Sequence, residues 1–149
     1  MKHISVMTPC YNEEGNILNI YQAVKAQFDK LPQYTYEHIF IDNCSTDRSR
    51  EILRALAQQD KNVKVILNAR NFGPNRSGTY GMFQGTGEAL ICIVCDLQDP
   101  PDMIPVFLEK WEEGYKEVMG QKTKSKENPL MFQVRKLYYK IMSALSETE

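Results

Sequence analysis

Residues 89–101 form an apolar run, a polar turn and two prolines: Ala89-Leu90-Ile91-Cys92-Ile93-Val94-Cys95-Asp96-Leu97-Gln98-Asp99-Pro100-Pro101. A continuous apolar run of this length is typical of a strand in a parallel sheet with both faces covered. Proline is tolerated in the first turn of a helix, so a helix is expected to begin at Pro100. The stretch therefore predicts a strand, a loop and a helix in succession, with this strand at the centre of its sheet.

The same succession recurs along the rest of the chain. Residues 14–31, for example, place apolar side chains such as Ile17 and Tyr21 at helical spacings of three and four. The predicted strands cover residues 4–7, 38–42, 63–67, 89–95 and 116–119. The predicted helices cover residues 14–31, a segment capped by Ser45 or Thr46, residues 79–86, residues 100–114 and residues 130–145. Strands that alternate with helices indicate an α/β domain with a mostly parallel sheet flanked by helices.

Length and composition exclude several classes of protein. The chain has 149 residues, of which 42% are hydrophobic, so it suits one globular domain and is not disordered as a whole. Its formal net charge is -1, so no general positive field is present to hold nucleic acid, and no nucleic-acid partner is expected. No apolar run reaches the length of a transmembrane helix, and no secretory signal begins the chain. The chain itself is therefore expected to be soluble.

Cys92 and Cys95 have the C-x-x-C spacing of a redox pair or of half a zinc site. They lie in the apolar run, however, and residues three apart on a strand point to opposite faces. The two histidines, His3 and His38, are not spaced as zinc ligands. This pattern favours two small buried hydrophobic residues, with reduced thiols, over a metal or redox site.

Polar loops follow four of the predicted strands. They cover residues 8–14, 42–47, 68–73 and 96–102. The carboxyl ends of parallel strands meet at one edge of a sheet, and ligands of such sheets bind there. These four loops are therefore expected to form one site. The chain contains neither G-x-x-x-x-G-K-[ST] nor a first loop with G-x-G-x-x-G, so P-loop and dinucleotide-binding proteins are disfavoured.

The fourth loop is the candidate metal site. Asp96 and Gln98 offer the oxygen ligands that Mg²⁺ prefers, and residues two apart on an extended segment share a face. Magnesium commonly takes one or two carboxylates together with substrate phosphates. The alternative is that Asp99 or Asp102 caps the helix that begins near Pro100.

The other loops offer groups that suit a nucleotide. Asp42 can accept hydrogen bonds from a ribose or a base, or it can simply form a turn. Tyr11 can stack on a base, or pack on its own loop. Arg70 can bind phosphate in a bidentate way, or remain a solvated surface residue. Asn12 and Glu13 can hold the first loop in shape.

Four stretches carry a resemblance to a known family: Thr8–Glu14, Ile41–Asp47, Arg70–Gly73 and Asp96–Pro101. They resemble family 2 glycosyltransferases of the GT-A fold. The last two stretches together resemble the polyisoprenyl-phosphate branch, which includes dolichol-phosphate mannose synthases and bactoprenol glucosyltransferases. The resemblance covers nearly the whole chain. Three positions depart from the family pattern: Val94 and Asn43 stand where aspartate is common, and Cys44 stands where glycine is usual.

The resemblance implies a set of site residues. The implied nucleotide-binding residues are Pro9, Tyr11, Asn12, Glu13, Asp42, Arg70 and Asp96. The implied ligands of a divalent metal, Mg²⁺ or Mn²⁺, are Asp96 and Gln98. No general base is identified in the chain, and the family's base is expected beyond Glu149.

The resemblance also implies an activity. It is the transfer of a sugar from a nucleotide diphosphate donor to a polyprenyl phosphate, for synthesis of cell-envelope glycans. A UDP-sugar is the expected donor, and GDP-mannose is the alternative. Two other functions stay open: a non-catalytic module that binds nucleotide sugars, and a transferase of the same fold that acts on a saccharide.

The C-terminal part is expected to lead toward the acceptor. Residues 1–122 are predicted to form the nucleotide-sugar-binding core. Residues 123–149 are predicted to form a charged loop and an amphipathic helix, which leads to an acceptor and membrane region outside this N-terminal fragment. The helix has an apolar face, with Arg135 and Lys136 among its polar positions, and this combination suits a membrane interface. The full-length protein is thus expected at the cytoplasmic face of the cell membrane, and pairing of two copies is an alternative cover for the apolar face.

Overall fold

The computed structural model describes residues 1–121 and 129–145. It divides the chain into two compact units, Met1–Val118 and Met119–Glu149, which are described separately. The predicted division after residue 122 lies further along the chain and stays a prediction. The first unit contains β1 (Lys2–Cys10), α1 (Ile17–Phe28), β2 (Tyr34–Asp42), α2 (Ser49–Gln59), β3 (Val63–Leu67), α3 (Pro74–Met82), β4 (Ala89–Cys92), the 3-10 turn η1 (Pro101–Met103) and α4 (Ile104–Glu112), and the second contains α5 (Pro129–Leu145). None of the helices within the described ranges is long and apolar enough to cross a membrane.

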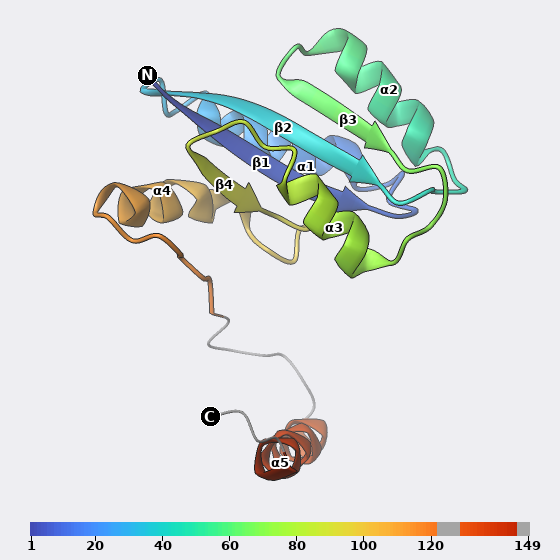
Figure 1. Cartoon of the computed structure of the whole chain (residues 1–149), viewed down its shortest axis with the longest axis vertical. Helices are drawn as coiled ribbons and strands as arrows, with labels where there is room; N and C mark the ends of the chain where they lie inside the picture. The colour runs from blue at the N-terminus through green and yellow to red at the C-terminus, as the bar shows by residue number, and fades with distance from the viewer. Residues whose placement is uncertain (122–128, 146–149) are drawn as a thin grey trace. The chain divides into compact units, whose positions relative to one another are not determined.

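The four strands form one parallel sheet in the order β3-β2-β1-β4. The central pair, β1 and β2, is in register from Lys2 opposite Tyr34 to Cys10 opposite Asp42. Figure 1 shows all four arrows pointing the same way. The α/β fold with a parallel sheet between helices is therefore confirmed.

One face of the sheet carries the main core. Ile20 of α1, Leu53 of α2 and Leu108 of α4 are almost fully buried there. They pack in one cluster with sheet residues such as Val6 and Phe40. The apolar side chains at spacings of three and four in α1 thus pack into the core, as the sequence pattern predicts.

Helix α3 covers the opposite face, in front of the sheet in Figure 1. It approaches closely at Gly81, where an added Cβ would lie 2.9 Å from Cγ2 of Ile41 and 3.3 Å from the Met7 side chain. The prediction of a helix over 79–86 is wrong in its bounds, because α3 begins at Pro74. Proline has a backbone angle suited to the first turn, so it starts this helix rather than extending the loop.

Two predictions about strands are wrong. The strand at 89–95 lies at the end of the sheet instead of its centre, and regular pairing stops at Cys92. Among the residues that the structure describes, only one face of this segment is covered: Ile91 and Ile93 are buried, whereas Leu90 and Val94 are more than a third exposed. An apolar run shows that burial is favourable, but it does not specify how many neighbours a strand has.

The predicted strand at 116–119 is absent as well. A strand exists only where its backbone pairs with another segment, and the described sheet contains no partner for these residues.

Ser45 and Thr46, which were predicted as alternative helix caps, do not cap the second helix. Helix α2 begins at Ser49, with Arg48 at the N-cap and no capping side chain. Ser45 and Thr46 instead hydrogen-bond to Asn12 of the first loop.

The C-x-x-C cysteines do not behave alike. Cys95 is buried as predicted, but Cys92 is exposed, because it lies on the uncovered face of β4. Cys95 hydrogen-bonds with Cys10, and this bond and burial raise the pKa of the Cys10 thiol well above its ordinary value. A thiol that stays protonated is a poor nucleophile and a poor metal ligand. The Cys10–Cys95 contact is therefore a packing contact.

Candidate functional site

The loops after the four strands lie along one edge of the sheet. Their starts are tied together by backbone bonds that continue the strand ladders: Asn43 N–H donates to Cys10 C=O, and Asn68 N–H to Asp42 C=O, both at 2.9 Å. All four strands end at this edge (Figure 1). The structure thus brings together the loops at 8–14, 42–47, 68–73 and 96–102.

The first loop is locked to the second by side-chain hydrogen bonds. The backbone N–H of Asn12 donates to Ser45 Oγ at 2.9 Å, and Asn12 Oδ1 accepts from the N–H of Thr46 at 2.8 Å. The next N–H, that of Glu13, donates to Ser49 Oγ at 2.9 Å. Asn12 therefore acts on the shape of the loop, as its position in the sequence suggests.

The residues flanking Asn12 differ in their exposure. Tyr11 is 48% exposed, so its ring is accessible to a base, whereas Pro9 is half-buried. The Glu13 carboxylate accepts a hydrogen bond from the Asn16 side chain at 2.7 Å, and the Glu13 carbonyl accepts from the backbone N–H groups of Asn16 and Ile17 at the start of α1. Of these residues, Tyr11 offers the largest accessible surface to a ligand.

Asp42 is fully buried at the end of β2. One carboxylate oxygen accepts the N–H groups of Cys44 and Ser45 at 3.1 Å, and Arg50 lies 3.5 Å from it. These contacts are internal, and they fit the turn-forming alternative. Cys44 has a positive φ of 67°, which explains why glycine suits this position.

The fourth loop differs from the extended geometry expected for it. Leu97 has a φ of 59°, and Gln98 N–H donates to Asp96 Oδ1 at 3.1 Å, so the segment is a turn and Asp96 and Gln98 do not share the face of a strand. Both side chains are nevertheless exposed, and only Leu97 separates the two residues in the sequence. The 3-10 turn that follows has Pro100 at its N-cap and no capping side chain.

The donor set at this loop is small. Within residues 1–121 and 129–145, no group of three or more His, Cys, Asp or Glu side chains could hold a metal ion. Asp96 and Gln98 therefore fit a hard cation only if other ligands come from a bound diphosphate, which is how Mg²⁺ is commonly held.

Backbone strain marks the same edge of the sheet. Asn12, Cys44 and Leu97 are the non-glycine residues with positive φ among those described, and each lies in a different one of the four loops. Such residues cost about 1–3 kcal/mol each and cluster at functional sites. The strain therefore supports this edge as the functional one.

The third loop carries a guanidinium group and an aromatic ring. Arg70 is exposed, and its guanidinium carbon lies 4.8 Å from the centre of the Phe72 ring. A stacked guanidinium keeps its N–H edge available for phosphate. The asparagines at positions 43, 68 and 71 hold this loop. They were not predicted as site residues, because the only signal in the sequence is their concentration in two loops.

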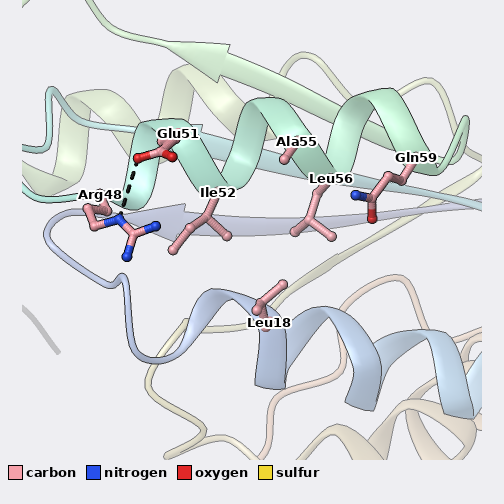
Figure 2. A pocket seen from close by; sticks show the side chains of 7 residues that line it. All are labelled: Leu18, Arg48, Glu51, Ile52, Ala55, Leu56 and Gln59. Carbon is pink, nitrogen blue, oxygen red and sulfur yellow. Dashed lines mark hydrogen bonds and ion pairs between the residues drawn. The ribbon is translucent and has the colours of Figure 1, made fainter.

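A shallow hollow of about 340 Å³ lies elsewhere on the first unit. Figure 2 shows it between α1 and α2, with Leu18 facing Ile52 and Leu56, and with the Arg48–Glu51 ion pair at one end. Its lining is mainly apolar, and it lacks the polar side chains of the four loops. The candidate site is therefore the loop edge and not this hollow.

Comparison with known proteins identifies the family. The family model described as glycosyl transferase family 2 matches residues 5–146. The chain belongs to glycosyl transferase family 2. It is 39% identical over 151 residues to the uncharacterized glycosyltransferase YkcC of Bacillus subtilis, covering 99% of this chain and 46% of that protein. It is 35% identical over 144 residues to the prophage bactoprenol glucosyl transferase homolog of Escherichia coli, covering 96% of this chain and 47% of the relative.

Solved structures of glycosyltransferases have the same fold as this family 2 chain. Staphylococcus aureus TarS 1–349, in complex with UDP-GlcNAc, matches with a TM-score of 0.58 and 24% identity over 85% of this chain and 39% of TarS. The mannosyltransferase PcManGT of Pyrobaculum calidifontis, in complex with GDP-Man and Mn²⁺, matches with a TM-score of 0.54 and 20% identity over 65% of this chain and 32% of that structure. The GT-A fold expected from the sequence is thus confirmed. The chain spans slightly less than half the length of the two curated relatives.

Proposed function

We propose that this family 2 chain holds the nucleotide-sugar donor of an enzyme that transfers a sugar to a polyprenyl phosphate for cell-envelope glycan synthesis. The observation that carries the proposal is the meeting of four polar loops at one sheet edge, in a chain similar to a bactoprenol glucosyl transferase homolog. A UDP-sugar is the proposed donor, with GDP-mannose as the alternative.

The roles of the side chains follow from their exposure. Tyr11 stacks on the base, and Arg70 binds the diphosphate with the N–H edge of its guanidinium. Asp96 and Gln98 hold the divalent cation, Mg²⁺ or Mn²⁺, together with the diphosphate. When bound, the cation neutralises the charge of the leaving diphosphate.

The buried residues act indirectly in this proposal. A contact between Asp42 and a ribose would require its carboxylate to give up bonds to the turn at 42–45 or to Arg50. Asp42 and Asn12 therefore serve mainly to shape the loops, while Pro9 and Glu13 form the wall of the nucleotide site beside Tyr11. The lipid phosphate then attacks the anomeric carbon of the positioned sugar, and the bond from that carbon to the diphosphate oxygen breaks as the nucleoside diphosphate leaves.

A second candidate function is a nucleotide-sugar-binding module without turnover. It is favoured by Val94, which is exposed two residues before Asp96 and leaves this segment with one fewer carboxylate than the family pattern. Weak metal binding would then reduce catalysis without removing binding of the nucleotide. The two candidates differ in how strongly a metal tightens nucleotide binding.

Titration with UDP and with GDP, in the presence and absence of Mn²⁺, tests this function. We expect UDP to bind the chain and Mn²⁺ to tighten binding, because the cation joins the diphosphate to Asp96. Asp96→Asn should reduce that enhancement about tenfold, the loss of about 1.4 kcal/mol of binding free energy. Isothermal titration calorimetry on the 149-residue chain provides the measurement.

Asp102→Asn is the matched control, since it removes an exposed carboxylate a few residues further along. It should leave the Mn²⁺ enhancement unchanged. Absence of binding by both nucleotides would overturn the proposal, and an equal effect of the two substitutions would remove Asp96 from the metal site. Binding of UDP without any enhancement by Mn²⁺ would favour the non-catalytic module.

We further propose that α5 lies at the surface of a membrane in the full-length protein, at its cytoplasmic face. Val134, Leu137 and Tyr138 belong to its predicted apolar face, and each is more than half exposed. The predicted face also includes Leu130, Ile141 and Leu145, whose side chains lie outside the described residues. Basic and aromatic side chains on the same helix suit a lipid headgroup region.

Sedimentation with vesicles tests this placement. Leu137→Asp should reduce binding to vesicles that contain anionic lipid by about tenfold, because it places a charge on the apolar face. Gln133→Asp introduces the same charge outside that face and should have a much smaller effect. Equal binding of the two variants would count against an interfacial helix. Self-association that Leu137→Asp abolishes, without vesicle binding, would instead support pairing of two copies.

A further inference from the structure

Arg50 closes onto the buried carboxylate at the end of β2. It lies in the first turn of α2, and its Nε is 3.5 Å from Oδ2 of Asp42. The Asp42 side chain is 0% exposed, whereas the Arg50 side chain is 31% exposed. One part of Arg50 is therefore buried against the carboxylate, while another part reaches the solvent. This contact lies at the loop edge, where the donor is proposed to bind.

The contact between Arg50 and Asp42 brings opposite charges together without a hydrogen bond. Nε of Arg50 is a buried donor that has no hydrogen-bond partner in the part of the chain that the structure describes. N–H groups that donate to oxygen typically lie at about 2.7–3.2 Å, and the 3.5 Å separation here is longer. A buried donor without a partner costs free energy. Arg50 therefore loses less by leaving Asp42 than it would by leaving a well-formed hydrogen bond.

The Asp42 carboxylate has unused capacity to accept hydrogen bonds. Its Oδ2 accepts the N–H groups of Cys44 and Ser45, both at 3.1 Å. Its Oδ1 accepts the same Ser45 N–H at the longer distance of 3.3 Å. A carboxylate can accept about four hydrogen bonds, so these two donors do not fill it. A ligand that reached Oδ1 could donate to it while the turn at 42–45 stayed intact.

Arg50 is also the neighbour of Asp42 that can move with the least change to the fold. The N–H groups of Cys44 and Ser45 belong to the backbone of the turn, and the Ser45 hydroxyl ties that turn to Asn12. Arg50, by contrast, is a long side chain with several rotatable bonds, and part of it already lies in solvent. Rotation about those bonds moves the guanidinium outward and leaves the backbone in place.

We infer that Arg50 is a gating residue, whose guanidinium must turn outward before Asp42 can accept a hydrogen bond from the nucleoside part of the donor. This inference rests on the proposed function for the identity of the ligand. In the unliganded chain the contact is inhibitory, because nucleotide binding has to displace a cation from a carboxylate. Removal of Arg50 should therefore strengthen binding. A general effect of charge has the opposite sign, since loss of a cation weakens binding of an anionic nucleotide.

The affinity for UDP, measured by calorimetry, distinguishes these two signs. Arg50→Ala should raise the affinity about tenfold, because it uncovers a charged acceptor. Arg54→Ala is the matched control, since it removes the same charge from an exposed position one turn further along α2. This control should not raise the affinity. A lower or unchanged affinity in Arg50→Ala would overturn the inference, and so would an equal gain in both variants.

A double-mutant cycle tests whether Arg50 acts through Asp42. Asp42→Asn keeps an oxygen for the N–H groups of Cys44 and Ser45, because both groups donate to one oxygen of the carboxylate. With Arg50 present, Asp42→Asn should change the affinity for UDP by less than about twofold, since the lost ligand contact and the lost ion pair offset each other. In the Arg50→Ala background it should remove the tenfold gain. A gain that survives Asp42→Asn would overturn the inference.

Nuclear magnetic resonance of the unaltered chain gives a test that does not depend on the stability of Arg50→Ala. The Nε–H signal of Arg50, assigned by its loss in Arg50→Lys, reports on the buried donor. Saturation with UDP should speed exchange of this proton with water, because the guanidinium turns toward the solvent. An exchange rate that stays at its unliganded value under saturation would overturn the inference.

Chemical labelling of carboxylates separates this inference from the proposed function. If neither UDP nor GDP binds the unaltered chain or Arg50→Ala, the proposed function fails, and access to Asp42 decides the role of Arg50 on its own. A water-soluble carbodiimide with glycinamide labels accessible carboxylates, and peptide mass spectrometry locates the label. Arg50→Ala should increase labelling of Asp42, and Arg54→Ala should leave it unchanged. Equal labelling of Asp42 in Arg50→Ala and the unaltered chain would show that Arg50 does not cover this carboxylate.

Discussion

The free energy of unfolding should fall by about 3 kcal/mol between pH 5 and pH 2 because of one buried carboxylate, Glu37. Its side chain is 3% exposed in the middle of β2. Burial acts to raise the pKa of Glu37, but the ion pair with Lys64 and hydrogen bonds from Ser5 and Thr86 outweigh it and lower the pKa from 4.5 to about 2.

The sign of the effect follows from that direction. The folded state binds the Glu37 proton less readily than the unfolded state, so this stabilisation is complete above pH 4.5 and is lost as the pH falls through about 2. Urea denaturation at a series of pH values measures it. Glu37→Gln should remove most of the dependence below pH 5, and it should also destabilise the chain at pH 7, because a neutral amide loses the attraction to Lys64.

Glu112→Gln is the control for this prediction. The pKa of Glu112 is also lowered, by Lys2 first, but its side chain is 39% exposed and its interactions are screened by water. This variant should keep the pH dependence of the unaltered chain almost intact. If Glu37→Gln retained the full slope between pH 5 and pH 2, another group would have to be responsible.

Gly87→Ala should destabilise the chain by about 3 kcal/mol, since there is no space for a methyl group. An added Cβ would lie 2.6 Å from the backbone nitrogen of Ser5 and 2.8 Å from the carbonyl oxygen of His3. These are backbone atoms of β1, which cannot rotate away. The N–H of Gly87 also donates to Ser5 Oγ at 2.8 Å, so a shift of Gly87 would disturb the start of β4.

Gly78→Ala provides the comparison, because a Cβ at Gly78 in α3 meets no atom within 4 Å. Alanine is preferred to glycine within a helix, so this variant should be more stable by about 0.5–1 kcal/mol. Thermal or urea unfolding of both variants gives the two differences. Equal stability of Gly87→Ala and the unaltered chain would mean that β1 and the turn before β4 can move apart without cost.

The candidate site was only partly predictable from the sequence. The four loops were identified correctly as neighbours, because parallel strands place their carboxyl ends at one edge. The sequence left the internal role of Asp42 as one of two alternatives and gave no sign of the network around Asn43, because these hydrogen bonds depend on the exact placement of loops. Asn43 stood out in the sequence only as a departure from the family pattern, whereas the structure shows its contacts with Asn68, Asn71 and Phe72.

The order of the strands in the sheet was also set by the tertiary structure and could not be predicted from the sequence. The run at 89–95 is a strand in its first four residues, as its apolar character predicts, yet it lies at the end of the sheet beside β1. The segment at 116–119 shows the same limit, since a strand-like composition without a pairing partner forms no strand. Strand propensity and apolar character belong to a single segment, whereas strand pairing depends on two segments that meet in the folded chain.

The sequence by itself determined the alternation of strands and helices, and with it the sheet edge at which the four polar loops meet. These features follow from periodicity and from short connections, which are local along the chain. The tertiary structure decided which polar side chains at that edge are accessible, with Tyr11, Arg70 and Asp96 exposed and Asp42 and Asn43 buried. A buried polar group must find its partners within the protein. Asp42 finds them in its own turn and in Arg50 of α2, whereas Asn43 finds them in the loop after β3.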